Sequence, residues 1–165
     1  MSYPDALDRE RGHNLCCFRT GDDMFGIATF AVREVLGHCE LHEVPLAPKF
    51  VAGMLAYRGE VLLAVSFRTL LGLAPRTEAS SAVVLQDTET GELFALLLDE
   101  LLDVVRVADN AWEPNPAALD DRSSLLFAGL YRMPGAPLVL LEPERVQPSS
   151  LMRHLDSWMR IGEQR

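Results

Sequence analysis

The densest group of metal-binding side chains in the sequence is HCELHE, residues 38–43, in which His38 and His42 stand four residues apart. On a helix, two histidines at this spacing would share one face and could bind one zinc ion. A glycine precedes the group and a proline follows it closely, which favours an extended strand or a loop instead. In a strand the two histidines would be about 13 Å apart, too far for one zinc ion to bind both imidazoles. We therefore expect a polar loop without a metal site, in which Cys39 is a small apolar side chain.

The second group that could do chemistry combines two adjacent cysteines, Cys16 and Cys17, with His13. A cysteine nucleophile needs a histidine beside its thiolate. Because the two cysteines lie in a predicted strand, one of them must face the core, while His13 lies in a polar segment before that strand. The sequence also contains no GxSxG, phosphate-loop or GxGxxG motif. We therefore predict no catalytic residue, no enzymatic activity and no cofactor. The remaining acidic group is expected to be a solvated rim between two strands: Asp99, Glu100 and Asp103.

The composition narrows the classes of partner and compartment. Fifteen basic residues against 24 acidic ones give a net charge of −9, which repels phosphate backbones and excludes nucleic acid as an expected partner. No apolar run approaches the roughly 20 residues that span a bilayer, and residues 1–14 lack the apolar core of a secretory signal. The 3 cysteines do not make a disulfide framework. We expect a cytoplasmic monomer of one domain or two small subdomains, without direct membrane insertion.

The elements that must position these residues are mostly strands. Short apolar runs broken by turn residues predict seven strands, at residues 15–18, 24–30, 61–65, 82–86, 93–98, 101–107 and 137–142. The turn residues TGDD predict a hairpin between the first two runs, and DTETGE predicts another, with Gly91 free to take a positive φ. Several strands at this spacing predict an antiparallel barrel or sandwich.

Two helices are also predicted. Ser66 can cap a short helix over residues 67–71, and Gly72 is well placed to end it. Ser149 or Ser150 can cap a second helix near the end of the chain. The apolar face of this second helix would consist of Leu151, Leu155, Trp158 and Met159. Such a face packs on the parent core more often than on a partner.

Four segments, in order and with matching spacing, resemble the CheW-like domain, the adaptor fold of bacterial chemosensory systems. They are FGIATFAVREV (25–35), EVPLAPKFVAGMLAYRGEVLLAVSFRTLLGL (43–73), AVVLQDTETGELFALLLDELLDVVRV (82–107) and LFAGLYRMPGAPLVLLEPERV (126–146). The resemblance implies a mainly β fold of two small SH3-like, five-stranded β-barrels packed side by side. The domain would span residues 15–146, after a polar lead over 1–14 and before a C-terminal amphipathic helix over 147–165.

The resemblance also implies a function. Such domains are not enzymes. They couple the cytoplasmic hairpin of a methyl-accepting chemoreceptor to the regulatory domain of a CheA-type histidine kinase, in the cytoplasm at membrane-associated receptor arrays. One barrel would bind the kinase, and the groove between the barrels would bind the receptor.

The site residues are carried over from the family pattern. Arg58 and Gly59 match its Arg-Gly turn, and Glu34 matches the glutamate of its V.EV segment, so the resemblance implies a Glu34–Arg58 ion pair. The apolar residues around Glu34 should divide between the core and a docking patch, because strand side chains alternate. Tyr57 could be an interface anchor or could cover its own barrel. The expected protein-binding residues are Val32, Glu34, Val35, Tyr57, Arg58 and Gly59.

The chain also departs from the family pattern. Ala56 and Tyr57 replace the usual Asn-Leu before Arg-Gly, and Leu63 replaces a strand proline. Ser66 replaces an aspartate but can still cap its helix, and Pro143 interrupts the closing segment. Two alternatives to the adaptor therefore stay open: a kinase-binding regulator that does not engage receptors, and an unrelated small-ligand-binding or enzymatic β-barrel.

Overall fold

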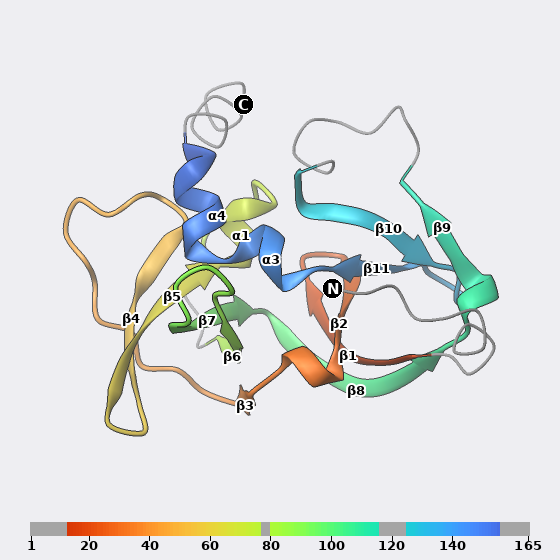
Figure 1. Cartoon of the computed structure of the whole chain (residues 1–165), viewed down its shortest axis with the longest axis horizontal. Helices are drawn as coiled ribbons and strands as arrows, with labels where there is room; N and C mark the ends of the chain where they lie inside the picture. The colour runs from red at the N-terminus through yellow and green to blue at the C-terminus, as the bar shows by residue number, and fades with distance from the viewer. Residues whose placement is uncertain (1–12, 77–79, 116–124, 156–165) are drawn as a thin grey trace.

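The computed structural model describes residues 13–76, 80–115 and 125–155, and these residues form two β-sheets with a few short helices (Figure 1). The strands are β1 (His13–Thr20), β2 (Asp23–Ala28), β3 (Glu34–Leu36), β4 (Val51–Tyr57), β5 (Glu60–Ser66), β6 (Ser81–Gln86), β7 (Leu93–Leu98), β8 (Glu100–Val107), β9 (Trp112–Pro114), β10 (Phe127–Tyr131) and β11 (Leu138–Leu141). The helices are η1 (Thr29–Ala31), α1 (Phe67–Leu70), η2 (Asp109–Ala111), α3 (Pro143–Val146) and α4 (Pro148–Arg153). The expected mainly β fold is confirmed. None of the helices in these ranges is long and apolar enough to cross a membrane.

The two sheets are interleaved along the chain. Sheet A has the order β8-β1-β2-β11-β10-β9, and sheet B has the order β3-β6-β7-β5-β4. The first two strands therefore share a sheet with the last four, through an antiparallel pairing of β1 with β8 and a parallel pairing of β2 with β11. Sheet A has six strands in place of the five expected, because the short strand β9 pairs with β10. Figure 1 shows the β4–β5 hairpin at one end of the molecule and β9 and β10 at the other.

Three apolar cores explain why the predicted strands are continuous apolar runs. In β1, Leu15 and Cys17 belong to a core inside sheet A, whereas Cys16 and Phe18 face a larger core shared by both sheets. In β7, Ala95 and Leu97 belong to a third core inside sheet B, and the alternate residues face the shared core. Both faces of these strands are buried, so the polar alternation of a half-exposed strand is absent. We call the two units barrel A and barrel B, and the core between them the inter-barrel core.

Local signals predicted several elements correctly. The two-residue hairpin between β1 and β2 forms as expected, and Gly91 takes a φ of 76° in the turn between β6 and β7. The hydroxyl of Ser66 accepts the backbone N–H of Thr69 at 3.2 Å and caps α1. This cap holds Phe67 in the inter-barrel core, where its ring meets Phe25 edge-on at a centroid distance of 4.8 Å.

Two predicted elements were wrong in their bounds. The strand expected over residues 24–30 ends at Ala28, because the chain turns into η1, which leaves Phe30 79% exposed. The C-terminal helix is not capped by Ser149 or Ser150. Its first residue is Pro148, and α4 has no side-chain cap from its own N-cap residue. Trp158 and Met159 of its predicted apolar face lie outside the described residues.

Candidate functional site

The Arg-Gly pair forms the tip of the β4–β5 hairpin. Tyr57 pairs with Glu60 across the ladder, so Arg58 and Gly59 are the two central residues of the turn. Their φ angles are 46° and 79°, and positive φ at both central residues is the pattern of a type I′ turn. Glycine adopts this conformation freely, but an arginine there is strained. The Arg58 side chain is nevertheless 73% exposed, so the strain is not explained by burial in the core.

The carboxylate of Glu34 contacts the side chains of Tyr57 and Arg58, the two residues that precede Gly59. Nη2 of Arg58 lies 3.1 Å from Oε2 of Glu34, which confirms the predicted ion pair. The Tyr57 hydroxyl donates a hydrogen bond to the same carboxylate oxygen. The Arg58 guanidinium also lies over the Tyr57 ring, 5.6 Å from its centroid, which is within cation–π range. We call Glu34, Tyr57 and Arg58 the clasp.

The clasp joins the two edges of sheet B. Glu34 lies in β3 and Tyr57 in β4, and these are the two outer strands of the sheet. Behind the clasp, His42 and Met54 exchange two backbone hydrogen bonds of 2.8 Å, which lays the β3–β4 connection along the open edge of β4. Side chains thus close barrel B beside the hairpin, where β3 and β4 share no ladder.

The clasp is charged at neutral pH. The hydrogen bond from the Tyr57 hydroxyl, followed by the contact with Arg58, lowers the pKa of Glu34 below its ordinary value. The same hydrogen bond raises the pKa of the Tyr57 phenol, so the proton stays on the tyrosine. Glu34 also raises the pKa of the Arg58 guanidinium. A carboxylate, a phenol and a guanidinium are therefore held together in defined protonation states.

The apolar residues around Glu34 divide as strand alternation predicts. Leu36 packs against the core inside barrel B, and Val32 packs against the inter-barrel core. Val35 points outward and is 46% exposed. Tyr57 packs against the core of barrel B while its hydroxyl reaches Glu34, so covering its own barrel is at least one of its roles.

Three exposed apolar residues near these strands were missed in the sequence. Val61 pairs with Ala56 beside the hairpin tip, and Phe30 and Val104 lie on η1 and β8, which both contact β1. All three are exposed. Hydropathy could not identify them, because Phe30 and Val61 belong to apolar runs whose other members are mostly buried. The turn of the chain at η1 brings Phe30 to the surface, and the end of the β4–β5 ladder does so for Val61.

The other two groups that could do chemistry, residues 38–43 and the cysteines near His13, make structural contacts. Cys39 packs against the core of barrel B, and the described residues contain no cluster of three potential metal ligands. Cys16 and Cys17 are buried on opposite faces of β1, and burial raises the pKa of both thiols, that of Cys17 to about 11. His13 is the first residue of β1, and its Nε2 lies 2.7 Å from the Asp109 carboxylate. The imidazole therefore pairs with a carboxylate and not with a cysteine thiol.

The prediction of a solvated acidic rim was wrong for Asp99. Its side chain is 11% exposed and pairs with Arg68 at 2.7 Å and with Arg76 at 3.4 Å. It also accepts the backbone N–H of Gly21 at 2.9 Å. Asp99 lies between β7 and β8, where the chain passes from sheet B to sheet A and meets α1 and the β1–β2 turn. Glu100, the next residue, is exposed and pairs with Arg19 as a surface residue.

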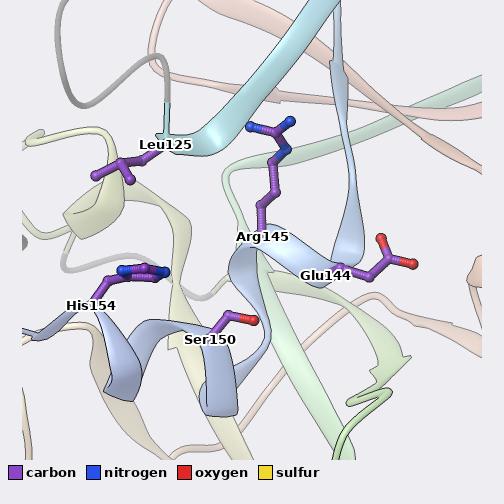
Figure 2. A pocket seen from close by; sticks show the side chains of 5 residues that line it. All are labelled: Leu125, Glu144, Arg145, Ser150 and His154. Atoms are coloured by element: carbon purple, nitrogen blue, oxygen red, sulfur yellow. The ribbon is translucent and has the colours of Figure 1, made fainter.

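A small cavity lies beside the C-terminal helices (Figure 2). Its lining comes from α3, α4, the residue after α4 and a residue just before β10: Leu125, Glu144, Arg145, Ser150 and His154. The volume of about 140 Å³ is well below the roughly 300 Å³ at which small-molecule pockets begin. This cavity therefore does not favour the small-ligand alternative.

Comparisons with known proteins agree with the fold described above. A family model described as the CheW-like domain matches residues 14–150. The chain is 30% identical over 138 residues to a chemotaxis protein CheW of Rhizobium meliloti, covering 84% of this chain and 89% of that protein. It is 26% identical over 144 residues to a probable chemotaxis protein CheW of Rhizobium etli, covering 87% and 93%. The crystal structure of the scaffolding protein TtCheW from Thermoanaerobacter tengcongensis superposes with a TM-score of 0.70 at 18% identity, over 79% of this chain and 89% of that one.

Proposed function

The chain belongs to the CheW-like domain family, and on that premise we propose that it is a non-enzymatic chemosensory adaptor. It couples the cytoplasmic tip of a chemoreceptor to a CheA-type histidine kinase and so controls the activity of the kinase. It acts in the cytoplasm, at receptor arrays on the membrane. The observation that carries the proposal is the family match, which extends over both barrels and the first residues of α4.

The clasp end of barrel B is the proposed kinase-binding surface. Arg58 projects there from a strained turn, and Val35 and Val61 are exposed on the neighbouring strands. An apolar surface beside one charged group is typical of protein interfaces, in which arginine is often enriched. Glu34 and Tyr57 hold Arg58 in place, so their role is to position it, and Gly59 completes the turn.

The receptor is proposed to bind between the barrels. Val32 packs on the inter-barrel core, and Phe30 and Val104 are exposed on two elements that both contact β1. A helical hairpin binds such a surface with the apolar face of one helix. The two proposed sites use different exposed side chains, Val35, Arg58 and Val61 for the kinase and Phe30 and Val104 for the receptor. An adaptor controls a kinase when its affinity differs between the active and inactive arrangements.

The test compares wild type with Arg58→Ala for binding to the kinase regulatory domain and, separately, to a receptor hairpin. Arg132→Ala is the matched control, because Arg132 is 60% exposed and pairs with Glu113 at 2.7 Å on sheet A. We expect Arg58→Ala to weaken kinase binding and Arg132→Ala to leave it unchanged. If wild type binds neither partner at tens of micromolar, the adaptor proposal fails. Kinase binding without receptor binding would select the stand-alone regulator instead.

A further inference from the structure

The contacts within the C-terminal helix α4 are too few to keep it helical on its own. It is six residues long, and its N-cap residue, Gln147, makes no side-chain hydrogen bond to the free N–H groups of the first turn. Isolated helices of this length do not form in water, since nucleation costs more than so few hydrogen bonds return. The stabilising contacts of α4 must therefore come from elsewhere in the chain.

The missing cap comes from the β6–β7 turn. Asp87 is buried, and Oδ2 of its carboxylate accepts the backbone N–H of Ser149 at 2.9 Å, in the first turn of α4. Its Oδ1 accepts the Ser149 hydroxyl at 2.8 Å. The same carboxylate accepts the N–H groups of Glu89 and Thr90, which orders the turn itself. One side chain thus caps α4 and shapes the turn on which the helix lies.

Further contacts join the same two segments. Oε1 of Gln147 accepts both the backbone N–H and the hydroxyl of Thr88, at 2.9 and 3.1 Å. Arg153 pairs with Glu89 at the surface. Leu151 is buried and adds its side chain to the inter-barrel core, and the partly buried Leu155 packs against the same core. Apart from these two leucines, residues 147–155 are held mostly by polar contacts to one turn of barrel B, although they follow β11 of barrel A.

We propose that residues 147–155 are a latch, a segment that is helical only while docked on the β6–β7 turn and that opens without either barrel unfolding. The strands of both barrels keep their ladders and most of their apolar contacts when the latch opens. Segments with few buried apolar side chains open at lower free energy than the ladders they contact. Asp87 and Ser149 contribute to the equilibrium, because opening separates the cap from the helix.

The latch also reaches the proposed docking surface, and this step rests on the proposed function. Gln86, the last residue of β6, donates a hydrogen bond to the carbonyl oxygen of Gly91 in the turn, at 3.0 Å. It accepts a hydrogen bond from Arg33 at 2.5 Å. Arg33 lies between Val32 and Glu34. A closed latch therefore orders the turn that supports the clasp side of β3, and an open latch weakens kinase binding without touching the kinase.

Hydrogen exchange of the full chain tests the latch. The amides of Leu151 and His154 donate within the segment, to Gln147 and Ser150, and report its opening. We expect both to exchange faster than the strand amides of β6 and β7. Ser149→Ala should accelerate them about tenfold, the effect of losing one hydrogen bond to a charged group, and leave the strand amides unchanged.

The control is Thr90→Ala, which alters the same turn by removing the hydroxyl that accepts the backbone N–H of Glu92 at 3.2 Å. It should leave the exchange of the latch amides as in wild type. Equal acceleration of latch and strand amides in Ser149→Ala, or no acceleration of the latch amides, overturns the latch. Asp87→Ala is the stronger variant, but Ser149→Ala keeps the turn intact and so remains interpretable if Asp87→Ala fails to fold.

Kinase binding by the same variant tests the coupling separately. We expect Ser149→Ala to bind the kinase regulatory domain several-fold more weakly than wild type and Thr90→Ala. Faster latch exchange with unchanged kinase binding overturns the coupling but leaves the latch standing. If wild type itself does not bind kinase, the proposed function fails, and the exchange result still decides whether the latch exists.

Discussion

Replacing Arg58 by asparagine separates two roles of this residue, holding the hairpin together and meeting a partner. The φ angles of Arg58 and Gly59 are 46° and 79°, so both central residues of the turn lie in the left-handed region. That region costs a non-glycine residue roughly 1–2 kcal/mol, and asparagine tolerates it better than arginine does. Asn-Gly is among the preferred pairs of type I′ turns. Arginine is therefore a poor choice for the turn, and its presence points to a role outside the turn.

The expected change in stability is small. The substitution relieves part of the backbone strain, and it removes one exposed ion pair and one exposed cation–π contact, which each contribute little to folding. The hydrogen bond from Tyr57 to Glu34 remains. In a chain of this size each kcal/mol shifts the melting temperature by about 2–4 °C, so these opposing changes should leave it within about 2 °C of wild type. Kinase binding should weaken about fivefold or more, as for an interface residue whose truncation costs over 1 kcal/mol.

Thermal unfolding and calorimetric titration of one preparation of Arg58→Asn check both quantities. A variant that unfolds several degrees below wild type would show that the guanidinium holds barrel B closed, and the strain argument would be wrong. A variant with wild-type stability and wild-type kinase affinity would remove Arg58 from the docking surface. Only unchanged or raised stability together with weakened binding agrees with the reasoning.

Two further substitutions test the clasp and the packing of barrel A. Tyr57→Phe removes the largest cause of the lowered pKa of Glu34, so this pKa should rise toward its ordinary value in a carboxyl NMR titration. A carboxyl with a lowered pKa in the fold contributes its full stabilisation above the ordinary glutamate pKa, and this stabilisation is lost as pH falls through the pKa in the fold. The variant should therefore lose this contribution at a higher pH than wild type. Identical titrations of the two proteins would refute the role of the hydroxyl. Gly129→Ala would drive its methyl group into the carbonyl oxygen of Glu113 on β9, and we expect it to lower the free energy of unfolding by about 2–3 kcal/mol in urea. Gly37→Ala, whose methyl group would meet no atom within 4 Å, should change it by less than about 0.5 kcal/mol, and equal effects of the two would refute the steric argument.

Much of the fold could be predicted from local patterns. The apolar runs at 82–86 and 93–98 predicted β6 and β7 because both faces of these strands are buried, and continuous apolar sequence is the signature of that burial. Ser66 predicted the start of α1, since a helix cap depends on atoms only three residues apart. The strand predicted over 24–30 failed at its end, because hydropathy does not distinguish a strand from the single helical turn that follows it.

The candidate site was predictable only in part. Glu34 and Arg58 were paired through the resemblance to a family pattern, and the structure confirms the contact. The sequence does not decide the role of Tyr57, because the same pattern fits an interface anchor and a residue that covers its own barrel. Its hydroxyl reaches Glu34 only because sheet B curls until its two edge strands meet.

By itself, the sequence determined the strand-rich class of this protein, its turns and caps, and the family to which it belongs. These properties depend on apolar periodicity and on contacts within a few residues, which the order of the amino acids displays directly. Only the tertiary structure decided that Asp99 is a buried partner of two arginines and that Asp87 caps a helix from another part of the chain. Both carboxylates look like ordinary turn residues in the sequence. Their roles depend on which distant segments the shared core brings against them, and no local pattern carries that information.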